Sequence, residues 1–226
     1  MTDRPARVPP FCVVLIGPDG SGKTSVSRRL IERGDLPFAR RDLIRESLHV
    51  LPRLDRLVTW WEGRQPLQPQ STSSEPDGRH SAMLRPLPAW KSMAIATYHA
   101  ADMFLGRPRL RRPRPESWLL VFDRSFYDYS FLRGHGNLPG WYLRTLGALV
   151  PEPDLLLYLQ RDPAEIYRDK PELSLDEIRR QQQAVEKLVQ SHRFGETLRA
   201  DGGLEATVDR AAEAIRQAAN TALLRK

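Results

Sequence analysis

Apolar residues along the chain form two kinds of pattern, short continuous runs and longer stretches in which they recur every three or four positions. The continuous runs predict buried parallel strands, because a central strand of such a sheet is covered on both faces. These runs lie at 11–16, 117–123 and 154–159, and a shorter strand is expected at 197–200. The stretches with helical spacing lie between and after the strands, so the pattern predicts an α/β fold with a three-layer, doubly wound parallel sheet.

The helical stretches can be bounded by local signals. Expected helices cover 23–33, 42–61, 89–106, 140–150, 162–171, 174–195 and 205–224. Asp162-Pro163 and Ser174 with Glu177 have the composition of helix starts, and Gly34 and Gly106 that of helix ends. Pro52 is expected to kink or break the second helix.

One stretch has neither pattern. Residues 62–80 are polar and rich in Pro, Ser and Gln, which predicts a mobile insertion without a packed core. The chain has 226 residues and contains no internal repeat and no linker composition elsewhere. We therefore predict a single domain over 1–226.

The strongest chemical signal follows the first strand. Gly17, Gly22, Lys23 and Thr24 match the phosphate-binding pattern Gly-x-x-x-x-Gly-Lys-(Ser/Thr), placed between an apolar strand and a helix. Glycines let backbone N–H groups wrap around phosphates, and the helix N-terminus adds positive potential. Lys23 is expected to reach the β- and γ-phosphates of ATP, and Thr24 to ligate Mg²⁺. The expected fold is therefore of the P-loop nucleoside triphosphate hydrolase type.

An acidic residue and a basic residue end the second apolar run. Asp123 follows Leu119–Phe122 directly and is predicted to act with Thr24 on Mg²⁺ or its waters. The alternative for Asp123 is a cap or a turn. Arg124 comes next and is suited to hold a second anion bidentately, through two guanidinium N–H groups.

Residues 162–175, a basic segment around the break at Pro171 between two predicted helices, are expected to close over ATP as a lid. Arg168 and Lys170 within it, and Arg161 just before it, are candidates to neutralise the charge that develops on the transferred phosphoryl group. Plain surface charge is the alternative interpretation of these residues.

The net charge is +7, and arginine supplies most of the positive side. Such a balance suits an anionic partner: nucleotide, nucleic acid or a membrane surface. Five arginines lie among prolines at 107–115, and the prolines predict a stiff connector rather than a helix. Nucleic acid is the less favoured partner, because no aromatic residues alternate with these charges. The longest apolar runs are too short to span a membrane, and Cys12 is the single cysteine. A cytoplasmic protein without a membrane partner is expected.

Three segments together resemble the thymidylate kinase family of nucleoside-monophosphate kinases, and more narrowly its divergent thymidylate-kinase-like branch. They are 17–25, 121–128 and 153–173, with the order that the family has, and the resemblance extends over about 10–216. It implies ATP and Mg²⁺ as donor and cofactor, a small-molecule acceptor such as dTMP, and a fold with one kinase domain. A homodimer is left open.

The resemblance also implies roles for individual residues. Asp19 falls where the family places an acid that meets the acceptor sugar, Arg124 would hold the acceptor phosphate, and Arg168 and Lys170 fall in the lid. Asp201 to Gly203 would contact adenine. The expected catalytic residues are Lys23, Asp123, Arg124, Arg168 and Lys170. The expected nucleotide-contacting residues are Gly17, Asp19, Gly20, Ser21, Gly22, Lys23, Thr24 and Ser25.

The chain departs from the family at the acceptor side. The Arg-Glu-Pro motif that usually follows the first helix is missing from 36–42, and the aromatic and Gln-rich stretch after the Asp-Arg pair is replaced by 125–131. Three hypotheses therefore stay open: a kinase of a dTMP-like nucleotide, a kinase of another small acceptor such as a sugar or biosynthetic intermediate, and a nucleotide-binding regulator.

Overall fold

A five-stranded parallel sheet with the order β2-β3-β1-β4-β5 forms the centre of the protein. The computed structural model describes residues 7–45, 48–52, 88–132, 138–171 and 173–224. The strands are β1 (Phe11–Ile16), β2 (Arg40–Ile44), β3 (Trp118–Phe122), β4 (Leu155–Gln160) and β5 (Gly195–Arg199). All four strand pairs are parallel, so the carboxyl ends lie along one edge, which is where ligands bind in open α/β sheets.

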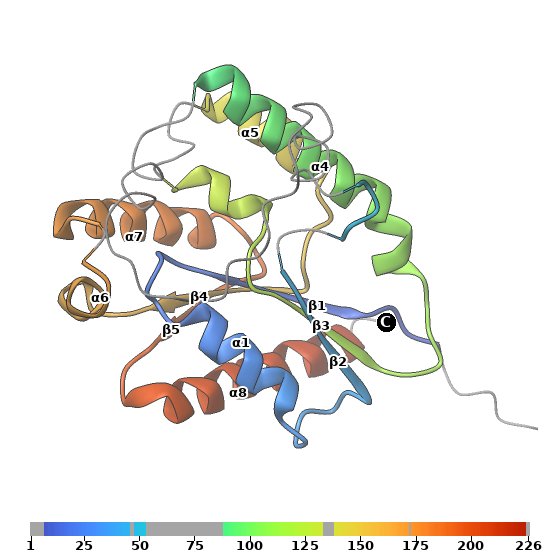
Figure 1. Ribbon diagram of the computed structural model, residues 1–226. Coiled ribbons are helices and arrows are strands. Elements are labelled where there is room, and N and C mark those ends of the chain that lie inside the picture. Colours follow the sequence, from blue (N-terminus) through green and yellow to red (C-terminus); the bar gives the residue numbers. More distant parts are fainter. Residues whose placement is uncertain (1–6, 46–47, 53–87, 133–137, 172, 225–226) are drawn as a thin grey trace, which may run out of the picture.

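Helices cover both faces of this sheet (Figure 1). On one face lie α1 (Lys23–Glu32) and α8 (Gly203–Leu224). On the other lie α4 (Ala89–Arg111), α5 (Gly140–Gly147) and α7 (Leu175–Gln190). Two short helices follow strand ends: η1 (Phe126–Ser130) after β3, and α6 (Pro163–Asp169) after β4. These layers confirm the predicted α/β, doubly wound fold.

The central strands are apolar on both faces for a simple geometric reason. Side chains alternate across a strand, so Val14 and Ile16 of β1 face α4, α5 and α7, whereas Val13 and Leu15 face α1 and α8. All of these side chains are buried. A continuous apolar run is thus the sequence signature of a strand between two helical layers, and it was predicted for β1, β3 and β4.

The two helix starts flanking the predicted lid are capped as their composition predicts. Asp162 accepts a hydrogen bond from the Ala164 N–H through its carboxylate at 2.6 Å. Ser174 accepts one from the Glu177 N–H through its hydroxyl at 3.3 Å. These caps satisfy backbone donors that a helix start leaves without partners, so both boundaries are set locally.

Residues 42–61 are not one helix, contrary to the prediction. Arg40–Ile44 form the edge strand β2, in which Leu43 pairs with Val121. Residues 48–52 are irregular, and the buried Asp102 of α4 accepts hydrogen bonds from three of their backbone N–H groups at 2.8 Å. Long-range pairing with β3 and α4 therefore overrides the local helical spacing. Residues 53–61, and the predicted insertion 62–80, lie outside the described residues.

The helix predicted to end at Gly106 continues to Arg111, and this corrects the expected connector. Gly106 is a packing position, because a Cβ there would lie only 2.3 Å from a methyl carbon of Leu48. Pro108 lies in the last turn of α4, and the N–H of Arg112 still donates to its carbonyl at 3.0 Å. Burial of Met103 and Leu110 holds this turn against the core despite the proline.

Two smaller boundaries also differ. Helix α7 ends at Gln190 rather than near Gly195, and Gly195 instead begins β5.

No helix in the described part of the chain is long and apolar enough to cross a membrane.

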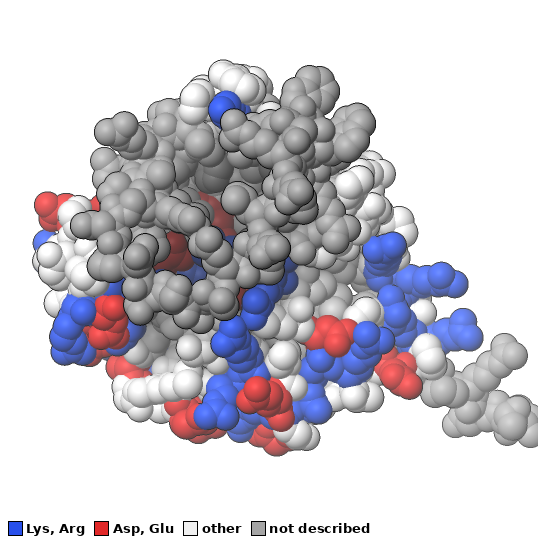
Figure 2. Space-filling model, in the orientation of Figure 1, with Lys and Arg blue, Asp and Glu red and all other residues white. Residues whose placement is uncertain are grey.

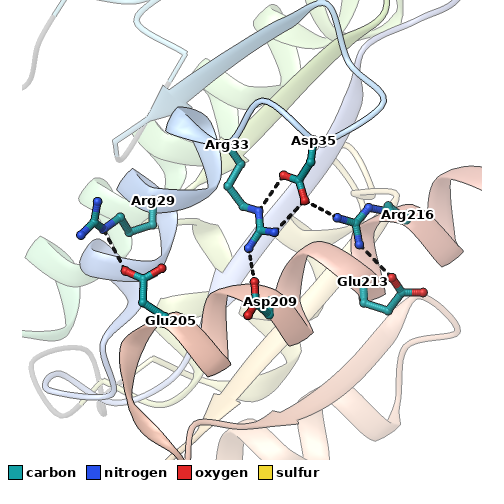
Figure 3. A network of polar contacts seen from close by, with 7 residues as sticks. All are labelled: Arg29, Arg33, Asp35, Glu205, Asp209, Glu213 and Arg216. Carbon is teal, nitrogen blue, oxygen red and sulfur yellow. Dashed lines mark hydrogen bonds and ion pairs between the residues drawn. The ribbon is translucent and has the colours of Figure 1, made fainter.

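Ion pairs on the surface join α1 and the turn after it to α8 (Figure 3). The network consists of Arg29, Arg33, Asp35, Glu205, Asp209, Glu213 and Arg216. Arg33 donates to both carboxylate oxygens of Asp35, at 2.8 and 2.6 Å, and also to Asp209. Arg216 donates to Asp35 at 2.6 Å and to Glu213 at 2.8 Å. Each of these charges faces one of opposite sign, so the network is complete without a ligand.

Candidate active site

The loop between β1 and α1 is shaped to surround an anion. We call residues 17–24 the phosphate loop. Gly20 and Gly22 adopt φ of 91° and 93°, a left-handed backbone that residues with a Cβ avoid. The hydroxyl oxygen of Ser21 is buried and has no hydrogen-bond partner. Because α1 begins at Lys23, its first free N–H groups point into this loop, where they favour negative charge.

Lys23 is held inside the loop. Its ammonium group donates to the carbonyl oxygens of Gly17 at 2.6 Å and Pro18 at 2.9 Å, and it lies 4.0 Å from Asp19. Burial lowers the pKa of Lys23, although the charges of Asp128, Asp19 and Asp123 oppose this effect. The side chain is therefore a buried cation whose present partners are mainly neutral carbonyls.

Thr24 and Asp123 come together behind the loop. Strand β3 lies beside β1, with Phe122 in register with Val14, so the residue after β3 reaches the start of α1. The Thr24 hydroxyl donates to the Asp123 carboxylate at 2.9 Å. The other oxygen of Asp123 is buried and has no hydrogen-bond partner. A hydroxyl and a carboxylate with spare lone pairs are oxygen ligands of the kind that Mg²⁺ takes.

Arg124 and Asp19 line the open side of the loop. Arg124 is 50% exposed, and its guanidinium lies 3.7 Å from the Asp19 carboxylate. Asp19 therefore stands between Lys23 and Arg124. This places the two residues that the resemblance assigned to the acceptor on one side of the phosphate loop, next to each other.

Asp128, the last residue of the segment 121–128 and not among the expected site residues, is buried in the same place. One of its carboxylate oxygens accepts a hydrogen bond from the Ser125 N–H at 3.2 Å, and the other has no partner. Burial raises the pKa of Asp128 to about 6, although attraction to Lys23 opposes this shift. The sequence signal was an acid five positions after Asp123, a spacing that can be interpreted only once η1 is known to turn it inward.

Arg161 is the basic residue of the lid region that contacts the phosphate loop. Its guanidinium donates to the Gly20 carbonyl at 3.1 Å and to the carboxylates of Glu165 at 3.1 Å and Asp169 at 2.5 Å. Arg168 is 73% exposed and lies 3.7 Å from Asp169. Lys170 is exposed, but its side chain passes close to Gly20. The predicted lid segment thus lies against the loop, and Arg161, named as a candidate beside Arg168 and Lys170 but left out of the expected catalytic set, donates a hydrogen bond to it.

A cavity of about 430 Å³ opens beside the phosphate loop. Its walls come from three places: the loop and α1 through Ser21 and Ser25, α6 through Arg168, and the start of α8 with the turn before it through Gly203 and Asp201. Arg210 fixes that turn by donating to the Asp201 carbonyl at 2.6 Å and to its carboxylate. The predicted adenine-contacting turn therefore borders a hollow continuous with the phosphate loop.

Among the described residues, no group of three or more His, Cys, Asp or Glu side chains is arranged to hold a metal ion. Unpartnered buried polar atoms do gather at the site, on Ser21, Asp123 and Asp128. Buried polar groups are rarely left without partners, so these atoms mark a place that a ligand would complete.

Comparison with known proteins supports the fold. No protein-family model matches the chain, and neither does any curated protein sequence. A thymidylate kinase from Candida albicans, whose structure is described as revealing the origin of broad substrate specificity, is similar over 95% of this chain and 94% of that chain, with a TM-score of 0.61 and 16% identity.

Two further solved structures give the same result. A thymidylate kinase from Ehrlichia chaffeensis has a TM-score of 0.53 and 16% identity, over 92% of this chain and 99% of that chain. A deoxyadenosine kinase from M. mycoides has a TM-score of 0.53 and 10% identity, over the same shares. The chain thus has the P-loop kinase fold of these enzymes along nearly its whole length.

Proposed function

We propose that the chain transfers the γ-phosphoryl group of ATP to a nucleoside monophosphate of the dTMP type. The observation that carries this proposal is the contact between Thr24 and Asp123 behind a glycine loop that holds Lys23. These are the parts that P-loop enzymes use to bind a triphosphate with its metal. The fold that the chain shares with two thymidylate kinases supports the choice of a nucleotide acceptor.

Mg²⁺ fits the residues that would receive it. The Asp123 oxygen that has no partner and the Thr24 hydroxyl would face the metal, directly or through water. Mg²⁺ prefers few protein ligands and completes its shell with phosphate oxygens and waters, so two oxygen groups suffice. When bound, it would neutralise charge on the β- and γ-phosphates.

The donor nucleotide would lie along the phosphate loop with its base in the neighbouring cavity. Backbone N–H groups of the loop and of the start of α1 would surround the phosphates. Lys23 would exchange its bonds to the Gly17 and Pro18 carbonyls for bonds to phosphate oxygens. The base would extend toward Asp201 and Gly203.

The lid would supply positive charge above the transferred group. Arg161 already contacts Gly20, and Arg168 lines the cavity. Lys170 extends past Gly20 from the other end of α6. The dissociative character of phosphoryl transfer makes such positioned cations the main contribution that a protein can offer.

The acceptor would occupy the side of the loop lined by Arg124 and Asp19. Arg124 would hold the acceptor phosphate, because its exposed guanidinium has only one acidic partner at 3.7 Å among the described residues. Asp19 would then be released from Arg124 and could accept a hydrogen bond from the acceptor sugar.

Asp128 favours a second candidate, a kinase whose acceptor is a hydroxyl group of a sugar or another small molecule. A hydroxyl must lose its proton on attack, and a carboxylate with a pKa of about 6 is suited to take it. A phosphate acceptor needs no such base. The deoxyadenosine kinase among the similar structures is named for an acceptor without a phosphate.

An ADP-release screen tests both candidates. The purified chain is given ATP and Mg²⁺ with nucleoside monophosphates, nucleosides and sugars in separate reactions. The proposal expects turnover with a nucleoside monophosphate and little with the others. Turnover with sugars or nucleosides alone would replace it with the second candidate. Tight ATP binding without any acceptor-dependent ADP release would instead favour a nucleotide-binding regulator.

A further inference from the structure

The end of α4 carries a concentrated group of arginines away from the phosphate loop. The arginine cluster consists of Arg107, Arg109, Arg111, Arg112 and Arg114. Arg109, Arg111 and Arg112 are exposed, and the other two are partly buried. Figure 2 shows basic side chains gathered at the right edge of the molecule, over the end of α4 and the chain that follows it. The surface there is strongly positive.

Among the described residues, the cluster differs from the arginines of the network between α1 and α8 in having no acidic partners. No ion pair joins any of its five members to an acid in the part of the chain that the structure describes. Glu116, the nearest acid in sequence, is exposed and does not pair with them. The Nε atoms of Arg107 and Arg114 are buried and have no acceptor. The region therefore has an excess of cationic donors, which an anionic partner would satisfy.

Trp118 holds one edge of this surface in place. The guanidinium groups of Arg114 and Arg40 lie 4.1 and 4.5 Å from the centroid of its ring. Backbone bonds between Val8 and Arg114, at 3.0 and 2.8 Å, fix the same position. The ring is already occupied by two cations, so it is not available to stack on a nucleic-acid base.

Two large apolar side chains are exposed among these arginines. Phe104 is 46% exposed and Leu105 is 50% exposed. Because helical residues four, seven and eight positions apart share a face, Phe104, Pro108, Arg111 and Arg112 lie along one side of the end of α4. Leu105 lies beside Arg109 and Arg112 by the same spacing. Apolar and basic side chains are thus interleaved on one outward face.

We propose that this face docks on a membrane surface rich in anionic phospholipids. The arginines would bind lipid phosphates through paired N–H groups, and Phe104 and Leu105 would enter the region between the headgroups. This surface is separate from the phosphate loop, so the inference does not rest on the proposed kinase activity. It revises the expectation that no membrane is a partner, because docking on a surface needs no spanning helix.

Two other occupants fit the observations less well. A second copy of the chain, placed symmetrically, would bring two unpaired arginine clusters toward each other, and like charges repel. Nucleic acid would match the charge, but it would leave Phe104 and Leu105 against a polar backbone, with no free aromatic ring to stack on bases. A lipid surface uses both kinds of side chain.

Vesicle sedimentation tests the proposal. The full chain is mixed with vesicles of phosphatidylcholine alone, or of phosphatidylcholine with phosphatidylglycerol, and the bound fraction is measured. Binding is expected only with phosphatidylglycerol and is expected to weaken with added salt. The variant R109Q/R111Q/R112Q is expected to bind on the order of a hundredfold more weakly, because each basic residue at an anionic surface contributes about a kcal/mol.

A matched control removes the same charge elsewhere. The variant R28Q/R144Q/R179Q replaces three exposed arginines of α1, α5 and α7, and it is expected to bind within about threefold of the original chain. Melting temperatures verify that both variants are folded. Equal losses in the two variants would overturn the proposal, because net charge alone would then explain binding. Binding to duplex DNA but not to vesicles would also overturn it.

The apolar part is tested separately by F104Q/L105Q. This variant keeps every arginine, so it is expected to retain vesicle binding at low salt. It is expected to lose the vesicle binding that the original chain retains at high salt. If F104Q/L105Q binds vesicles as tightly as the original chain at all salt concentrations, Phe104 and Leu105 are not part of the docking face.

Discussion

Charges at the phosphate loop and charges between α1 and α8 are arranged in opposite ways. In the network of Figure 3, each arginine meets a carboxylate at the surface, and Asp35 meets two arginines. At the phosphate loop, Lys23, Asp123 and Asp128 are buried, and two of these three side chains retain a polar atom without a partner. One region is electrostatically complete, whereas the other is arranged for a charged ligand.

This difference indicates that the phosphate loop matters mainly for function, and that the network between α1 and α8 contributes only to stability. Exposed ion pairs are each worth little, because water and salt screen them. Buried charges without full partners cost stability, and such costs are usually retained where a ligand or a reaction uses them. Changes at the loop should therefore alter activity strongly, and changes in the network should alter stability slightly. The following predictions can break or sharpen this contrast.

Lys23→Ala should have the largest effect. Removing the cation from the β- and γ-phosphates is expected to lower turnover by at least about a thousandfold, measured as ADP release. Lys187→Ala, at an exposed position of α7, serves as the matched control and should keep normal turnover. A folded Lys23→Ala variant with near-normal turnover would refute the assignment of the phosphate loop.

Asp128→Asn should change how stability depends on pH. The pKa of Asp128 is raised from 3.8 to about 6 in the folded chain, so its stabilising contribution is complete below about pH 4 and is lost as the pH rises through 6. Asn stays neutral and can still accept from the Ser125 N–H. Relative to the original chain, the variant should gain up to about 3 kcal/mol between pH 4 and pH 7, measured by urea unfolding. A difference that does not vary with pH would contradict the raised pKa.

Arg124→Ala should affect one substrate more than the other. The apparent KM of the acceptor is expected to rise roughly 10- to 100-fold, the usual cost of losing a hydrogen bond to a charged group, while that of ATP changes by about twofold or less. Arg179→Ala, paired with Asp176 at 3.6 Å on α7, is the control. Equal increases for both substrates would place Arg124 away from the acceptor phosphate.

Arg33→Ala should have the smallest effect: a slight loss of stability with turnover unchanged. It removes the bonds to Asp35 and Asp209, and the melting temperature is expected to fall by only a few degrees, with a smaller fall at high salt. Arg28→Ala, at an exposed position of α1, is the matched control. A large fall in melting temperature would mean that the network is a main support of the fold.

Much of the architecture was predictable because it is encoded locally. The apolar runs of β1, β3 and β4 and the caps at Asp162 and Ser174 need no knowledge of distant residues. Strand β2 was missed, because Leu43 and Ile44 fit a helical spacing and become a strand only by pairing with β3. The extension of α4 beyond Pro108 was missed for a similar reason, since buried Met103 and Leu110 outweigh the local preference of proline.

The candidate site divides in the same way. The phosphate loop and Asp123 could be predicted, since a strict spacing and a position at a strand end define them. Asp128 could not be selected, and Arg161 could be named only as one of three basic candidates, because their positions depend on the turn of η1 and on contact with Gly20 across the fold. Sequence spacing identifies site residues that lie next to each other along the chain. Residues that reach the site from distant parts of the chain can be identified only once the fold is known.

The central position of β1 has a consequence for how the protein folds during its synthesis on the ribosome. Its partners are β3 and β4, so Val13 cannot complete its backbone bonding until Val121 and Leu155 have been synthesised. The strand that leads into the phosphate loop is therefore synthesised before both of its partner strands. Such distant pairing slows folding and leaves an apolar strand exposed on the growing chain. Until β3 and β4 have been synthesised, β1 is therefore an apolar segment that needs protection from aggregation.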